Sequence, residues 1–105
     1  MSERQRYGDG TLRTVYSCNE FHVDEIVLPA GGSTGMRTYA RRLHTGVIFK
    51  GGLTLYKGWG NGYIVEQYKE GDQFEIDFDQ PHRMEAGENG VELIQASIPA
   101  VGDNP

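Results

Sequence analysis

Fifteen glycines divide this chain into short segments that are rich in Val, Ile, Thr, Tyr and Phe. β-Branched and aromatic residues are typical of strands, whereas glycine allows the backbone conformations that tight turns need. Several segments alternate apolar and polar residues with the period of a half-buried strand, and none carries a helical stripe of about ten residues or more. The sequence therefore predicts an all-β protein with little or no helix.

Clusters of Gly, Pro, Asn and Asp separate the predicted strands. We expect strands at residues 12–16, 20–28, 36–39, 46–50, 53–56, 63–68, 73–77, 82–85 and 91–97. We expect turns at residues 29–32, 51–52, 58–62, 71–72, 79–81 and 87–90.

Length and composition limit the class of protein. A chain of 105 residues suits one domain, residues 1–105, with a core at about 29–97 and peripheral ends at 1–11 and 99–105. Its 37% hydrophobic and 24% charged residues are typical of a globular protein. No apolar run approaches the roughly 20 residues of a membrane-spanning helix, and the polar start lacks the apolar stretch of a secretory signal. We therefore expect a cytoplasmic protein with no membrane partner.

The formal net charge of −5 argues against nucleic acid as a partner, because such binding depends largely on Lys and Arg. Three arginines, Arg37, Arg41 and Arg42, nevertheless lie close together in the sequence. They predict either a local anion site or a solvated strand end that is kept soluble by charge.

The segment 71–85, GDQFEIDFDQPHRME, contains a Gly-Asp turn, a strand, a proline-containing bend and a histidine. This order resembles the second motif of the cupin superfamily, and the similarity extends over residues 29–97. The resemblance implies a single small β-barrel of the jelly-roll type that pairs as a homodimer. It also places His82 at the position of a family metal ligand. Asp77 and Asp79 replace the usual proline and glycine of the motif.

The first cupin motif keeps its glycines at Gly32 and Gly51, but its metal ligands are replaced. His44 stands where the metal-binding glutamate belongs. The histidine pair of the motif maps to Thr38 and Ala40 or, with a spacer one residue longer, to Arg37 and Tyr39. Neither register supplies a histidine, and the sequence does not choose between them.

Two segments are similar to the mannose-6-phosphate isomerase type of cupin within the superfamily. Arg42-Leu43-His44 is similar to its Arg-x-Glu, and Pro-Ala-Gly-Gly, beginning at Pro29, is similar to the segment that enters its first motif. Cupin enzymes hold a divalent metal with three nitrogens and a carboxylate. At the four corresponding positions of this chain, only His44 and His82 are candidate metal ligands. We therefore expect no tightly held cofactor. Zinc or copper at His44 and His82 is the alternative.

The candidate ligand-binding residues are His82, His44, Arg37, Tyr39 and Arg41. Imidazole can bind a metal, donate a proton or form hydrogen bonds near neutral pH. Histidine in place of glutamate adds a donor, so the pocket would suit an anion better than a cation. If the histidine pair maps to Arg37 and Tyr39, the strand turns one face with Arg37, Tyr39 and Arg41 toward the pocket. If the pair maps to Thr38 and Ala40, these three residues face away from the pocket. The alternative is that both histidines are ordinary interior residues.

These residues leave three hypotheses for function. The first is a small-molecule-binding protein that recognises a polar, anionic metabolite similar to a sugar phosphate. The second is a metal-free or weakly metal-dependent isomerase or lyase, in which His82 and His44 move a proton and Tyr39 or an arginine stabilises charge. The third is an interaction or assembly module. Its barrel would be filled by Met36, Ile48, Phe74, Ile76 and Met84.

Overall fold

The computed structural model describes residues 3–38, 42–59 and 62–99. Within them it has strands and no helix, and the strands are β1 (Gln5–Tyr7), β2 (Gly10–Ser17), β3 (His22–Leu28), β4 (Arg42–Trp59), β5 (Gly62–Lys69), β6 (Gln73–Ile76) and β7 (His82–Pro99). All pair antiparallel in the order β1-β2-β3-β7-β4-β5, and β6 also pairs with β4. The all-β prediction is confirmed. In these ranges there is no helix capable of crossing a membrane.

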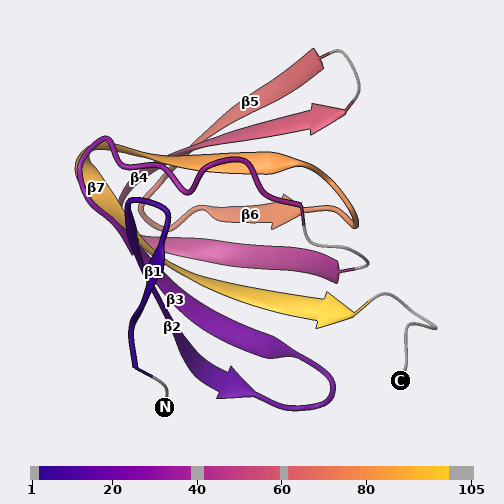
Figure 1. Cartoon of the computed structure of the whole chain (residues 1–105). Coiled ribbons are helices and arrows are strands. Elements are labelled where there is room, and N and C mark those ends of the chain that lie inside the picture. Colours follow the sequence, from indigo (N-terminus) through magenta and orange to yellow (C-terminus); the bar gives the residue numbers. More distant parts are fainter. Residues whose placement is uncertain (1–2, 39–41, 60–61, 100–105) are drawn as a thin grey trace.

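Strands β4 and β7 are paired along almost their whole lengths and fold the sheet over itself (Figure 1). Their pairing changes register between Gly51 and Leu53, where residues 87–90 of β7 stand opposite Gly52. Gly51 and Gly90 have φ angles of 83° and 78°, which favour glycine, and a Cβ on Gly51 would overlap the Gly90 carbonyl. The turns expected at 51–52 and 87–90 are therefore bends inside continuous strands.

The N-terminal part and the segment after β3 also differ from the sequence prediction. Gln5–Tyr7 forms the additional strand β1 on the edge of the sheet, and Tyr7 joins the core. Residues 36–38 do not form the strand expected at 36–39. Arg37 makes only an isolated bridge, in which its backbone exchanges two 2.8 Å hydrogen bonds with His82. Gly35, at φ 76°, bends the chain just before this bridge, which prevents a regular ladder.

The apolar core joins the two halves of the folded sheet. Its members are Tyr7, Ile26, Leu28, Ile48, Leu53, Leu55, Phe74, Ile76, Met84, Ala86, Val91 and Leu93. Full burial of such a side chain contributes about 1.5–3 kcal/mol, so this cluster dominates the stability of the fold. Met36, expected inside a filled barrel, is instead 50% exposed.

The inward-facing residues of β3, β7 and β4 form rows across the sheet, because each strand turns every second side chain inward. The register sets three rows: His22, Ser97 and His44; Asp24, Gln95 and Gly46; Ile26, Leu93 and Ile48. The first two rows are polar and the third is apolar. The interior is therefore polar at one end and apolar at the other.

Gly46 provides a test of the packing between β4 and β6. A Cβ on Gly46 would overlap the Phe74 ring and lie 2.8 Å from the carbonyl oxygen of Ile94. We expect Gly46→Ala to lower the free energy of unfolding by about 1–3 kcal/mol in urea denaturation. Gly62→Ala is the control, because a Cβ there meets nothing within 4 Å. Equal stability of the two variants would contradict the packing described.

Candidate functional site

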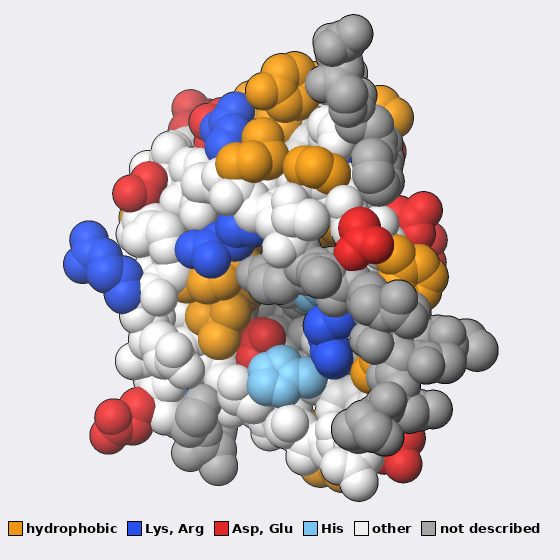
Figure 2. All heavy atoms as spheres, turned by 45° about the vertical axis from the view of Figure 1, so that its right-hand side comes forward, with side chains coloured by type: hydrophobic (Ala, Val, Ile, Leu, Met, Phe, Trp, Pro, Cys, Tyr) orange, Lys and Arg blue, Asp and Glu red, His pale blue; other side chains and the backbone are white. Residues whose placement is uncertain are grey.

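A cavity of about 570 Å³ lies at the polar end of the interior. Its polar lining includes Asp24, Arg37, Arg42, His44, Gln95 and Ser97. Figure 2 shows a hollow on this face of the molecule, with histidine, acidic and basic side chains around it. The volume falls within the range of small-molecule sites, which is about 300–1,000 Å³.

Arg42, the first residue of β4, is held in place by Ser97 of β7. Its Nε and Nη2 donate to Ser97 Oγ at 3.2 and 3.1 Å, and Nη2 also donates to the Ser97 carbonyl at 3.2 Å. Ser97 is buried, so these bonds fix the guanidinium at the cavity wall. Nη1 makes no hydrogen bond to the described part of the chain, which leaves it available to a ligand.

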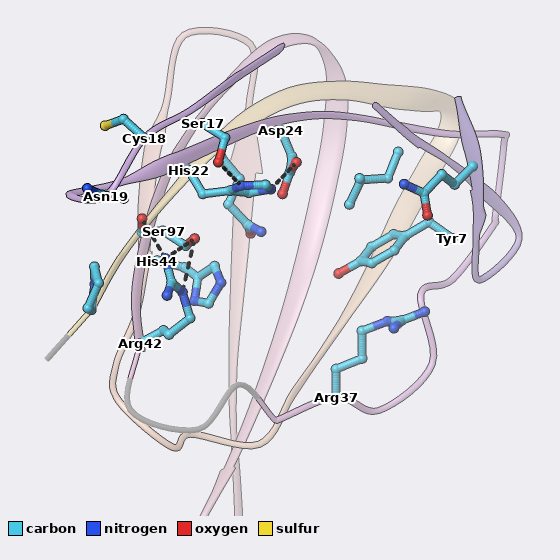
Figure 3. A pocket seen from close by; sticks show the side chains of 14 residues that line it. Tyr7, Ser17, Cys18, Asn19, His22, Asp24, Arg37, Arg42, His44 and Ser97 are labelled. Carbon is cyan, nitrogen blue, oxygen red and sulfur yellow. Dashed lines mark hydrogen bonds and ion pairs between the residues drawn. The ribbon is translucent and has the colours of Figure 1, made fainter. Parts of the chain in front are cut away.

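Asp24 and His22 form a second polar group, on β3. Asp24 Oδ1 accepts a 2.9 Å hydrogen bond from Thr14 Oγ1 and lies 2.9 Å from His22 Nε2. His22 Nδ1 lies 3.2 Å from Ser17 Oγ. Figure 3 shows this group on one side of the cavity and Arg42, His44 and Ser97 on another. The carboxylate of Asp24 is thus engaged by its neighbours on the β2–β3 hairpin.

Gln95 lies in the second polar row and lines the cavity. Its side chain is 2% exposed, and its Oε1 has no hydrogen-bond partner among the described residues. A buried polar group without a partner costs about 1–3 kcal/mol, so buried amides are normally bonded to protein, water or a ligand. The amide oxygen of Gln95 is therefore an unsatisfied acceptor inside the wall beside the cavity, buried too deeply for a molecule in the cavity to reach it.

His44 lines the cavity, whereas His82 is buried outside its lining. Their ring centroids are 6.4 Å apart. Burial, assisted by the positive charges of His82 and Arg42, lowers the pKa of His44 to about 4, so its imidazole is neutral at pH 7. Burial also lowers the pKa of His82, although the 2.9 Å hydrogen bond from its Nδ1 to the Gln80 carbonyl opposes this.

Arg37 and Tyr7 form the far end of the cavity in Figure 3. The guanidinium carbon lies 4.0 Å from the centre of the Tyr7 ring, and Nε donates to the Thr34 carbonyl at 3.1 Å. Thr38 is exposed. This agrees with the register in which residue 37, and not residue 38, faces the pocket.

The structure places the predicted site residues at different distances from the cavity. The structure brings His44 and Arg37 to the cavity and places His82 beside His44 but off the lining. Tyr39 and Arg41 lie outside the described residues, as does Ala40. Sequence reasoning missed Tyr7, His22, Asp24, Gln95 and Ser97. A signal existed for four of them, because the inward positions change from polar to apolar along β3 and from apolar to polar along β7.

The donor atoms around His44 do not match the cupin metal site of three nitrogens and a carboxylate. Among the described residues, His44 and His82 have their ring centroids 6.4 Å apart, and the carboxylate of Asp24 is paired with His22. Across residues 3–38, 42–59 and 62–99, no three His, Cys, Asp or Glu side chains are grouped to hold a metal ion. This site therefore does not fit a metal of that type.

No protein-family model matches the chain, and no curated protein matches it by sequence. Solved structures do match. The cupin domain of Schizosaccharomyces pombe Cnp3 has a TM-score of 0.83 at 12% identity, over 96% of this chain and 71% of that one. A tryptophan-to-tyrosine variant of Bacillus subtilis oxalate decarboxylase has a TM-score of 0.83 at 16% identity, over 95% of this chain.

This chain spans only 28% of that enzyme. Another oxalate decarboxylase structure, from work on the Mn(II) centres of the enzyme, has the same TM-score of 0.83. At such low identities the similarity shows the fold, and it confirms the predicted cupin jelly-roll. The narrower similarity to the mannose-6-phosphate isomerase type, the cytoplasmic location and the absence of a nucleic-acid partner stay predictions.

The lowered pKa of His44 predicts a pH-dependent stability. Between pH 6.5 and about 4 the unfolded chain binds a proton at His44 that the folded chain does not, so acid favours unfolding. We expect the free energy of unfolding to fall by about 1–3 kcal/mol from this residue as the pH drops from 7 to 4. His44→Gln should flatten the profile measured by urea denaturation.

Ile48→Val is the control, because it removes a buried methyl group from the same strand without removing a titratable group. Its profile should lie lower than that of the unmodified protein but keep the same slope. A His44→Gln profile as steep as that of Ile48→Val would show that His44 is not buried in its neutral form.

Proposed function

We propose that this chain is a cupin-type binding protein for a small, polar, anionic metabolite, such as a sugar phosphate, that occupies the cavity against Arg42. The observation that carries the proposal is the guanidinium of Arg42, which three hydrogen bonds to Ser97 hold in place with Nη1 available. Arginine that is fixed and partly removed from water forms strong charge-assisted hydrogen bonds with carboxylate and phosphate groups.

The charges around the cavity support an anion over a cation. Arg37 and Arg42 contribute two positive charges to the described lining, and Asp24 contributes one negative charge that Thr14 and His22 already engage. His44 is neutral at pH 7 because of its lowered pKa, so its ring can donate or accept a hydrogen bond without repelling an anion.

Proton transfer by His82 and His44, the enzymatic alternative, has less support. A histidine with a pKa of about 4 is a weak base at neutral pH, and this is the case for His44. His82 lies off the cavity lining and directs Nδ1 to the Gln80 carbonyl. The interaction-module hypothesis accounts for the apolar end of the interior, which is filled, but not for the polar cavity.

A thermal-shift screen of sugar phosphates, nucleotides and dicarboxylates at constant ionic strength tests anion binding. A ligand at 100 times its Kd should stabilise the protein by about 2.7 kcal/mol. Arg42→Gln should lose at least tenfold in affinity because it removes the fixed cation. Arg6→Gln is the control, since Arg6 is an exposed arginine of β1 that does not line the cavity. Equal anion affinity in both variants, or no shift with any anion, would contradict the proposal.

We further propose that the chain pairs as a homodimer through the outer face of β4 and β7. Val47, Phe49, Ile94 and Ile98 are large apolar residues exposed on this face. Val47 is the register partner of Ile94, and Ile98 is the partner of Leu43, so the residues form one outer strip. Contiguous apolar patches are uncommon on monomers, and a two-fold axis would cover the same strip on both copies.

Val47→Asp should convert the dimer to a monomer in light scattering coupled to size-exclusion chromatography, because it buries a charge in the outer strip. The control is Ile64→Asp, which places the same charge at an exposed apolar residue of β5. Weak dimers form at concentrations on the order of tens of micromolar. If the unmodified protein is a monomer at such a concentration, this pairing is wrong.

A further inference from the structure

We propose that Ser17, His22 and Asp24 form a hydrolytic centre on the wall of the cavity, with Ser17 as the nucleophile that attacks a carboxylic ester. The proposal goes beyond anion binding, because it assigns a reaction to this cavity. Three observations carry it: the hydrogen bonds that join the three side chains, the exposure of Ser17, and the position of all three on the lining of one cavity.

A β-bulge in β2 turns Ser17 toward His22. Thr14 stands opposite Asp24. Ser17, three residues later on β2, stands opposite His22, which is only two residues from Asp24 on β3. Residues directly opposite in an antiparallel pair point to the same side of the sheet, so the extra residue of β2 brings both hydroxyl groups to the cavity side. Bulges are frequent next to active sites because they redirect a side chain in this way.

The hydrogen bonds give the neutral ring of His22 a defined tautomer (Figure 3). Nε2 lies 2.9 Å from Oδ1 of Asp24, and because a carboxylate only accepts hydrogen bonds, Nε2 carries the proton. Nδ1 therefore accepts a hydrogen bond from the Ser17 hydroxyl at 3.2 Å. The two ring nitrogens are exchanged relative to the common catalytic triad, which leaves the order of nucleophile, base and carboxylate unchanged.

Exposure and burial are distributed as such a centre requires. Ser17 is exposed, so a molecule in the cavity can reach its hydroxyl group. Asp24 is buried, and its Oδ1 also accepts a 2.9 Å hydrogen bond from Thr14 Oγ1. The carboxylate is thus held from two sides and in turn fixes the orientation of the His22 ring.

The reaction needs an ester and water. Oγ of Ser17 forms a bond to the acyl carbon while its proton passes to Nδ1 of His22, and the carbonyl electron pair moves to the carbonyl oxygen. The intermediate collapses when the C–O bond to the alcohol breaks, and His22 gives the proton to the leaving oxygen. Water then attacks the acyl group by the same steps, which releases the acid and regenerates Ser17. Asp24 acts through His22 and is therefore a positioning residue.

The charge of the lining favours the negative oxygen of the intermediate. Among the described lining residues, Arg37 and Arg42 are positive and Asp24 is negative, so the cavity is positive overall. A fixed positive environment around the carbonyl oxygen stabilises the charge that develops there.

The substrate class follows from the row across the sheet, and this part rests on the proposed anion binding at Arg42. Ser17, His22 and Ser97 are register partners on neighbouring strands, so Ser17 and Ser97 stand two strand spacings, or about 10 Å, apart. Ser97 holds the guanidinium of Arg42. A substrate with its ester carbonyl at Ser17 and an anionic group at Arg42 therefore has a short carbon chain between the two, as in a monoester of a dicarboxylic acid.

Two chromogenic esters of equal acyl length test the centre: the mononitrophenyl ester of adipate, which has a free carboxylate, and nitrophenyl hexanoate, which has none. The unmodified protein should release nitrophenol in an initial burst as the acyl-enzyme forms. Ser17→Ala should reduce kcat at least hundredfold. Ser33→Ala is the matched control and should retain the activity, because Ser33 does not line the cavity. Equal rates in the two variants would overturn the proposal.

Covalent labelling tests the nucleophile without a variant. A fluorophosphonate should modify Ser17 of the unmodified protein, which peptide mass spectrometry identifies. His22→Gln keeps the hydroxyl group but removes the base, so labelling should slow at least tenfold. Modification of another residue, or none, would show that Ser17 is not activated.

Asp24→Asn tests the positioning role. The neutral amide does not stabilise the imidazolium that forms when His22 takes the proton, so kcat should fall at least hundredfold while KM stays within about threefold. A merely structural role of Asp24 would leave kcat unchanged in the folded variant and would contradict the assignment.

The two esters also separate this proposal from the proposed function. The adipate ester should have a kcat/KM at least tenfold above that of the hexanoate ester, and Arg42→Gln should remove this preference while Ser17 is still labelled. Equal hydrolysis of both esters would overturn the anionic substrate. If anions bind but Ser17 is neither labelled nor needed for hydrolysis, the hydrolytic centre alone is wrong. If no anion binds but the hexanoate ester is hydrolysed through Ser17, the proposed function alone is wrong.

Discussion

The antiparallel pairing of β4 with β7 is the constraint on which the rest of this structure depends. The first half of β4 pairs with the last part of β7, and beyond Gly51 the remaining halves of the same strands pair again. Strands β3, β5 and β6 attach to this pair, so the bend at Gly51 folds the sheet around one core. The same register brings His22, Ser97 and His44, which are far apart in sequence, into one row.

A graded interior follows from that register. Polar groups inside a barrel cost free energy unless they are bonded, and most of those at the polar end have partners: Asp24 has Thr14 and His22, and Arg42 has Ser97. Gln95 is different, because its Oε1 lacks a partner among the described residues.

The comparison with oxalate decarboxylase separates fold from chemistry. The two chains share the cupin jelly-roll at a TM-score of 0.83, yet His44 stands where the resemblance implies a glutamate. Histidine in this place has a lowered pKa because it is buried close to His82 and Arg42, and it is neutral where a glutamate would be charged. A shared fold therefore does not fix the chemistry of its cavity.

The sequence by itself determined the all-β class, most strand positions, the glycines at the bends, and His44 and Arg37 as candidates. These features depend on local periodicity and on residue types that favour particular backbone conformations. Only the tertiary structure decided that the turns at 51–52 and 87–90 are bends within strands, and that His82 is buried off the cavity. It also brought His22, Asp24, Gln95 and Ser97 together, because cross-strand register joins residues that no local pattern connects.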